Sequence, residues 1–115
     1  MEKSLFEDLS NARNRAYLGV HGTTIPLDVQ IKENTPPGAY ITQTEMNSPA
    51  MMAGIQSGDI ITAVNGSDIA SFEQLVTKLS QCHPEDVITV RVSRQAPNNF
   101  VELDIEVTLT SATHN

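Results

Sequence analysis

The sequence predicts an α+β domain, a small and partly open β-barrel or sandwich of five or six short strands with two helices. Apolar and polar residues alternate near the C-terminus with the two-residue period of half-buried strands. Two segments carry helix-start signals, and one of them continues with apolar residues at helical spacing. The length of 115 residues indicates one domain with one core, since two cores would be cramped.

The first residues and the last few are expected to lie outside this domain. Residues 1–14 carry apolar residues at helical spacing, but the stretch is polar and too short to be stable as an isolated helix. We expect a linker tail or a fraying helix there. The domain itself is expected to span residues 15–110, followed by a disordered tail over residues 111–115.

Two strands are predicted in the first half of the chain. Residues 17–24 are β-favouring and are broken by two glycines, which indicates a strand that another backbone approaches closely. Residues 39–44 form the second strand, with Tyr40 and Ile41 as expected core residues. Between them, residues 25–37 alternate in part but are flanked by prolines. The sequence leaves two alternatives for that segment, a short edge strand and an irregular loop.

The middle of the chain predicts a short helix, a strand and a tight turn. Ser48-Pro49 starts the helix, because serine caps and proline suits the first helical position. Gly54 suits a left-handed stop, and a strand follows over residues 59–64. Asn65-Gly66 is a two-residue turn signal, because both residues tolerate positive φ. Three methionines around this helix are interpreted as packing residues that fill gaps: Met46, Met51 and Met52.

A longer helix is predicted over residues 72–81. Ser71 and Gln74 form a capping box at its start, and Pro84 ends it. Four apolar residues fall on one side of this helix: Phe72, Leu75, Val76 and Leu79.

The C-terminal part predicts a half-buried hairpin. Apolar residues alternate with polar ones over residues 88–92 and again over residues 101–109, on either side of a turn. Glu102, Asp104 and Glu106 then form a solvated outer face. Calcium would bind there only if other oxygens converged on the row.

Composition and side-chain spacing exclude several functions. Seven Lys and Arg against fourteen Asp and Glu give a net charge of −7, which argues against nucleic acid and anionic lipid. No apolar run approaches the roughly 20 residues of a membrane span, and no signal-peptide region follows Met1. The lone Cys82 and three scattered histidines offer no disulfide framework and no metal site. Cys82-His83 leaves open an enzyme that uses a thiolate, although a structural cysteine is favoured.

Two segments resemble a known family. Ser48 to Gly66 reads SPAMMAGIQSGDIITAVNG and closely resembles the core signature of PDZ domains. Tyr17-Leu18-Gly19-Val20 resembles their carboxylate-binding loop, an X-Φ-Gly-Φ pattern. Both stand in the family's order, with a helix after the second segment, and the match runs from about Arg15 to Leu109.

The order of the strands refines this resemblance. Almost nothing foldable precedes Tyr17, whereas a long alternating strand closes the chain. This is similar to the circularly permuted PDZ domains of bacterial proteases, most of all to the module that follows the catalytic domain in HtrA-type trypsin-like serine endopeptidases. There a linker that ends in a basic residue leads into Tyr-Leu-Gly-Val/Ile, as Arg15 to Val20 do here. Residues 25–37 match nothing in that family.

The resemblance implies a function without catalysis or cofactor. PDZ domains capture protein C-termini by β-strand addition, so the expected partner is a C-terminal peptide with an apolar last residue. The parent protein would be a serine protease of bacterial protein quality control in the cell envelope, outside the cytoplasm. Its catalytic domain would lie upstream in cis, and an oligomer would form through the parent. The alternatives are a PDZ module of a carboxyl-terminal processing protease, a site-two protease or a secretion component, and a groove that serves only in packing or oligomerisation.

The expected site follows from the residues and from the resemblance. A glycine turn aims successive N–H groups into one concavity, which suits a carboxylate, and the peptide would pair with the strand from Val20. By resemblance, the carboxylate-binding loop is Tyr17, Leu18, Gly19 and Val20, and the groove residues are His21, Gly22, Phe72, Val76 and Leu79. Leu18, Val20, Val76 and Leu79 would line the pocket for the last side chain. Phe72 replaces the histidine found in many PDZ domains, which predicts an apolar residue two positions before the peptide end. Arg15 would either assist the carboxylate or remain a solvated charge.

Overall fold

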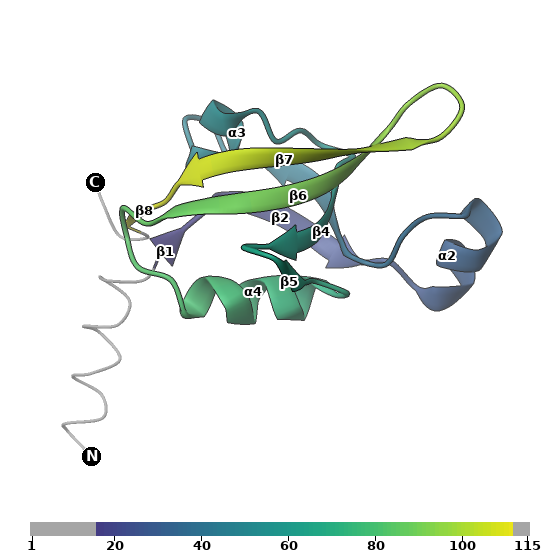
Figure 1. The fold of residues 1–115 in the computed structure, drawn as a ribbon, viewed down its shortest axis with the longest axis horizontal. Coiled ribbons are helices and arrows are strands. Elements are labelled where there is room, and N and C mark those ends of the chain that lie inside the picture. The colour runs from purple at the N-terminus through teal and green to yellow at the C-terminus, as the bar shows by residue number, and fades with distance from the viewer. Residues whose placement is uncertain (1–15, 112–115) are drawn as a thin grey trace, which may run out of the picture.

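The computed structural model describes residues 16–111, in which eight strands and three helices alternate (Figure 1). The first part of the chain and residues 112–115 lie outside the described residues, and with them the expected linker tail, Arg15 and most of the expected C-terminal tail. The elements follow one another as β1 (Ala16–Tyr17), β2 (Val20–Thr24), α2 (Leu27–Glu33), β3 (Ala39–Thr44), α3 (Pro49–Ala53), β4 (Ile60–Val64), β5 (Ser67–Asp68), α4 (Phe72–Ser80), β6 (Val87–Gln95), β7 (Phe100–Thr108) and β8 (Thr110–Ser111).

Most of the strands belong to one antiparallel sheet. Its order is β2-β3-β4-β6-β7, with the short β5 paired to β4, while β1 and β8 form a separate two-stranded ribbon. The predicted α+β class with a partly open sheet is confirmed. The strand β2 has a partner on one side only, and β7 stands at the other edge of the sheet. This leaves the backbone of β2 free to pair with another chain.

The core lies between the sheet and α4. It is made of aliphatic side chains from the inner faces of the strands, of Leu75 from α4 and of Leu18 from the turn between β1 and β2. The largest fully buried apolar residues are Leu18, Ile41, Ile60, Ile61, Val64, Leu75, Ile88, Val90, Val92, Val107 and Leu109. Strand alternation confirms Ile41 as a core residue. It places the neighbouring Tyr40 on the outer face with 38% of its surface exposed, so the expectation for Tyr40 was wrong.

The C-terminal hairpin is long and only partly buried. Alternation holds in β6 from Val87 to Val92, but of the apolar residues of β7 only Val107 is fully buried, and Val101 is exposed. Figure 1 shows the reason, because the tip of the hairpin extends past the body of the molecule. The carboxylates of β7 face outward, and Asp104 pairs with Arg91 at 2.9 Å. The expected solvated charged face is confirmed.

The predicted caps and turns form as expected. Ser48 Oγ accepts a hydrogen bond from Met51 N–H at 3.1 Å, and Gly54 ends α3 with φ 102°. Asn65 and Gly66 both have positive φ in the turn from β4 to β5. Ser71 Oγ accepts from the N–H of Gln74 at the start of α4. These features depend only on residues within a few positions of one another, which is why the sequence predicts them.

The prediction for residues 25–37 was wrong, because the segment contains the helix α2. Pro26 stands before its first turn, and Asn34 closes it in the left-handed region at φ 57°. Gln30 Nε2 also donates to Ile25 O at 3.0 Å. No residue of α2 is buried, and Leu27 and Ile31 are 68% and 74% exposed. A helix without a buried face shows no helical periodicity of apolar residues, so the sequence pattern did not indicate a helix here.

The methionines near α3 are exposed rather than packed. Met46 and Met52 are 80% and 77% exposed, and Met51 is 41% exposed. The interpretation of these residues as gap fillers was therefore wrong. The α3 helix has only one and a half turns, and it buries Pro49 and Ala50 instead.

A buried ion pair fixes the connection between α3 and β4. Asp59 is 2% exposed and receives hydrogen bonds from Arg94 Nε at 2.8 Å and from Arg94 Nη2 at 2.7 Å. It also accepts from Gln56 N–H, and Arg94 Nη2 donates to Gly54 O. The hydrogen bond from the Arg94 guanidinium to Asp59 raises the pKa of Arg94. The pair ties the 54–59 segment to β6.

Candidate functional site

The turn between β1 and β2 is the centre of the candidate site. Gly19 has φ 87°, and a Cβ atom at this position would lie 2.2 Å from Ser48 Cβ. Ala50 N–H donates to Leu18 O at 2.9 Å, and Glu45 N–H donates to Gly19 O at 2.8 Å. The turn is thus held from one side, by α3 and by the end of β3.

These two bonds fix the direction of the neighbouring N–H groups. A trans peptide unit carries its C=O and N–H on opposite sides. Because the carbonyls of Leu18 and Gly19 point to α3 and β3, the N–H groups of Gly19 and Val20 point away from them. Two successive donors therefore face the open side of β2. Such a pair suits a bound anion, as the sequence predicted for this loop.

The free edge of β2 continues from this turn. Gly19 O is bonded on the β3 side, and so is His21 O, which accepts from Thr42 Oγ1 at 3.1 Å. Backbone groups alternate between the two sides of a strand, so Val20 and Gly22 present their N–H and C=O at the open edge. A segment in extended conformation can pair there.

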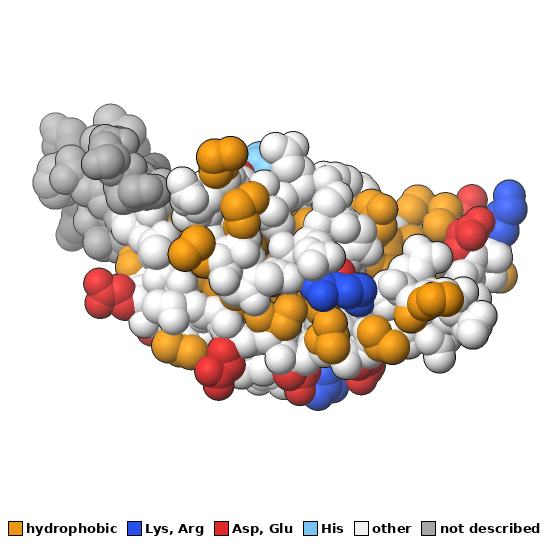
Figure 2. All heavy atoms as spheres, turned by 90° about the horizontal axis from the view of Figure 1, so that it is seen from above, with side chains coloured by type: hydrophobic (Ala, Val, Ile, Leu, Met, Phe, Trp, Pro, Cys, Tyr) orange, Lys and Arg blue, Asp and Glu red, His pale blue; other side chains and the backbone are white. Residues whose placement is uncertain are grey.

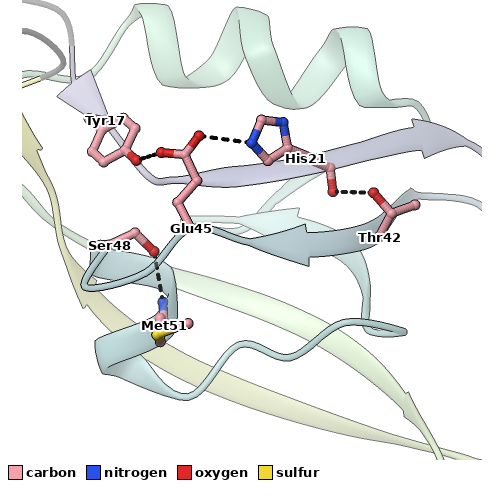
Figure 3. Close-up of polar contacts among 6 residues, drawn as sticks. All are labelled: Tyr17, His21, Thr42, Glu45, Ser48 and Met51. Carbon is pink, nitrogen blue, oxygen red and sulfur yellow. Dashed lines mark hydrogen bonds and ion pairs between the residues drawn. The ribbon is translucent and has the colours of Figure 1, made fainter.

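A network of side-chain contacts joins the residues on either side of the turn to Glu45, the residue that follows β3 (Figure 3). Tyr17 Oη donates a hydrogen bond to Glu45 Oε1, and His21 Nε2 lies 2.8 Å from Glu45 Oε2. The His21 side chain, expected in the groove, is thus held by Glu45 (Figure 3). Glu45 itself was missed by the sequence reasoning. It stands 28 residues from Tyr17, and no local signal marks the contact.

The helix α4 forms the wall opposite β2. Phe72 and Leu79 are partly buried against the core, while Val76 is 51% exposed. Leu75 is fully buried and is a core residue, as predicted. A Cβ atom at Gly22 would lie 3.1 Å from the ring of Phe72 and 2.1 Å from Tyr40 O, so Gly22 allows the close approach of both. The predicted residues of the two walls therefore stand on facing elements.

A hydrogen bond closes the far end of this groove. Thr24 Oγ1 accepts from Phe72 N–H at 2.9 Å and lies 3.1 Å from Glu73 Oε1, to which it donates. The end of β2 and the first turn of α4 are thereby joined. Thr24 was not among the predicted site residues, because the partners are 48 residues apart.

The alternative of a thiolate enzyme gains no support. Cys82 Sγ donates to Lys78 O at 3.4 Å, and burial, together with the negative charge of Asp86, raises the pKa of the thiol. The thiol is therefore protonated at neutral pH, which makes it a poor nucleophile. Within residues 16–111, no cluster of His, Cys, Asp or Glu could hold a metal ion. No helix of that same part of the chain is long and apolar enough to cross a membrane.

A comparison with protein families decides the identity of the fold. Residues 10–109 match the family model described as PDZ domain. The chain belongs to the PDZ domain family. The strand order agrees, because the long β7 and β8 follow the other strands in the chain while β8 pairs with β1.

The relatives of this PDZ domain are proteases. It is 31% identical over 101 residues to the periplasmic pH-dependent serine endoprotease DegQ of Escherichia coli K12, which covers 86% of this chain and 21% of the relative. It is 33% identical over 98 residues to a probable periplasmic DegP-like serine endoprotease of Chlamydia muridarum, covering 82% of this chain and 19% of the relative. The chain thus spans about a fifth of the length of the curated relatives, in a non-catalytic part.

Solved structures share the fold. The HtrA3 PDZ domain bound to the phage-derived ligand FGRWV has a TM-score of 0.67 and 24% identity, covering 84% of this chain and 86% of that chain. The HtrA-type protease AlgW with a decapeptide has a TM-score of 0.71 and 15% identity, covering 84% and 29%. The predicted resemblance to HtrA-type PDZ modules is confirmed.

Proposed function

We propose that this PDZ domain binds the C-terminal segment of a protein partner as an added strand along β2. The observation that carries the proposal is the turn at Gly19, whose carbonyls are bonded on one side while successive N–H groups face the other. A terminal carboxylate accepts hydrogen bonds from those donors, and the rest of the peptide pairs with the free edge of β2.

Side chains of β2 and α4 determine which peptide residues are preferred. Val20, Val76 and Leu79 surround the last side chain of the peptide, with the fully buried Leu18 beneath them, so that side chain is apolar. Phe72 meets the residue two positions earlier and favours an apolar residue there as well. Arg15, outside the described residues, adds electrostatic attraction to the carboxylate. The affinity is about micromolar, near −8 kcal/mol, because a few anchors must offset the ordering of a free peptide end.

In the full-length protein, we propose that this domain is the substrate-binding and regulatory module of an HtrA-type serine endopeptidase. The relatives that share its sequence are periplasmic serine endoproteases, which supports a parent protein outside the cytoplasm with a catalytic domain in the same chain. Two proteins of similar structure have peptides bound: the HtrA3 PDZ domain with FGRWV, which ends in valine, and AlgW with a decapeptide.

Peptide titration tests the groove. We expect a dye-labelled peptide ending in valine to bind, and its C-terminal amide to lose most of the affinity because the loop donors then face a neutral group. Val76→Asp should weaken the acid peptide at least tenfold. Val101→Asp is the matched control, since Val101 is similarly exposed, at 42%, on the opposite edge strand. Equal binding of acid and amide would overturn the proposed mechanism.

A further inference from the structure

A cavity lies beside the end of β2, away from the Gly19 turn. It has a volume of about 600 Å³ and is bordered by α2, the end of β2, the outer face of β3, residues 56–60 and the tip of the β6–β7 hairpin. Its lining includes the apolar side chains of Val29, Tyr40 and Phe100 and the charged side chains of Asp59 and Arg94. Figure 2 shows hydrophobic side chains gathered toward the end of the molecule that α2 occupies.

The proposed path of the peptide along β2 ends beside this cavity. A peptide whose carboxylate lies at the Gly19 turn runs antiparallel to β2, so its upstream residues reach Thr23 and Thr24. The bond between Thr24 and Phe72 closes the space between β2 and α4 at that point. Thr23 and Thr24 are also lining residues of the cavity. A longer peptide that leaves the groove therefore arrives at the rim of the cavity.

The helix α2 has no role in the core that would explain its apolar residues. None of its residues is buried, and Val29 is 37% exposed in the cavity wall. Tyr40, 38% exposed, faces the same space from β3. Exposed apolar side chains around a concave site are typical of ligand pockets of 300–1,000 Å³. The site is thus suited to a large apolar side chain.

A polar atom in the cavity wall indicates which kind of ligand group fits the cavity. Thr35 Oγ1 is buried, and within the described part of the chain it has no hydrogen-bond partner. Thr35 lines the cavity as well. The hydroxyl both donates and accepts, and an N–H or O–H donor on a ligand is one partner that would satisfy it. Tyrosine and tryptophan combine an aromatic body with one O–H or N–H donor.

We propose that this cavity binds a tryptophan or tyrosine side chain located about five to seven residues before the C-terminus of the bound peptide. This inference rests on the proposed function. The position follows from the length of β2, because an added strand pairs about one residue with each of Val20 to Thr24 before it reaches the cavity.

Peptides of different length test the inference on the full chain. A ten-residue peptide ending in valine, with tryptophan six residues before the end, is compared with the same peptide carrying serine there and with its last four residues alone. Since this protein has no tryptophan, the fluorescence of the peptide reports its burial directly. We expect the tryptophan peptide to bind about tenfold more tightly than the serine peptide, with a blue-shifted emission.

Substitutions in α2 test whether the gain in affinity comes from the cavity. Val29→Glu should remove the tenfold gain and leave the affinity for the four-residue peptide unchanged, and Val29→Ala should remove part of it without introducing a charge. Ile31→Glu is the matched control, because Ile31 is on the same helix, 74% exposed and not a lining residue. Equal binding of the tryptophan and serine peptides, or a gain that survives Val29→Glu, overturns the inference. The proposed function then still stands if the four-residue peptide binds as acid and not as amide, and it fails if that peptide does not discriminate.

Discussion

At the scale of single residues, Gly19 sets the geometry of the carboxylate-binding turn. A Cβ atom there would overlap Ser48, and the φ of 87° is unfavourable for any other residue. We expect Gly19→Ala to lower the free energy of unfolding by about 3 kcal/mol, from the backbone and the overlap together. Gly66→Ala is the control, because Gly66 has a similar φ of 83° but open space around it, and should cost about 1 kcal/mol. Urea denaturation measures both, and equal losses would contradict the steric part of this account.

The two arginine–aspartate pairs of β6 are expected to differ in their effect on stability. Arg94→Met leaves the buried Asp59 carboxylate without its cation, and should lower the free energy of unfolding by about 3 kcal/mol. Arg91→Met breaks a pair whose side chains are 48% and 53% exposed, so it should cost much less stability than Arg94→Met. Denaturant unfolding at pH 7 compares the two variants. A larger loss for Arg91 than for Arg94 would contradict the role assigned to burial.

The exposed pair of Arg91 and Asp104 also leads to a prediction about the titration of Asp104. The hydrogen bond from Arg91, together with its positive charge, holds the pKa of Asp104 below its ordinary value of 3.8. A carboxyl whose pKa is lowered by folding contributes stability above its ordinary pKa, and that contribution disappears as the pH falls through the lower, folded value. Arg91→Met should raise the pKa of Asp104, as measured by carboxyl-carbon NMR in an acid titration. An unchanged midpoint would show that the pair does not form in solution.

At the scale of elements, α4 and α2 contrast. The sequence predicts α4 because Ser71 caps it and Leu75 lies on a buried face, so its amphipathic pattern is visible. It does not predict α2, whose seven residues are all outside the core. Isolated helices of this length are marginal in water. We therefore expect α2, in the wall of the cavity, to open more readily than α4.

Hydrogen exchange measures that difference. We expect the amides of α2 to exchange at close to the rate of an unstructured chain, because few tertiary contacts oppose local opening. The amides of α4 and β6 should be protected, since their buried residues belong to the core. A peptide with an upstream tryptophan should slow exchange in α2, whereas its serine counterpart should not. Protection of α2 equal to that of β6 in the free protein would contradict this ranking.

At the scale of the whole molecule, the two ends of the described chain are paired. Ala16 of β1 stands opposite Ser111 of β8, while β7 forms the outer edge of the sheet beside β6. Figure 1 shows both ends at the side of the molecule that lies opposite α2. The fold therefore depends on which strands are neighbours and less on the order in which the chain visits them.

A rearranged chain tests this view. Joining Ser111 to Ala16 by a short Gly/Ser linker, in place of residues 1–15 and 112–115, and opening the chain in the turn at residues 96–99 makes β7 the first strand. We expect this variant to fold cooperatively and to bind the valine-ended peptide within about threefold of the parent, because every strand pair is kept. Circular dichroism melting and peptide titration check it. A chain without a cooperative transition would show that the original order is required.

The sequence by itself determined the longer strands, the caps, the Asn65-Gly66 turn and the family signature, because each shows in residues within a few positions of one another. The tertiary structure alone decided the brace of Tyr17 and His21 on Glu45, the bond from Phe72 to Thr24, and the pairing of Asp59 with Arg94. These contacts join residues 24 to 48 positions apart, where no local pattern carries the information. The tertiary structure alone also decided the cavity beside α2, because its walls come from four separate segments and from one helix without a buried face.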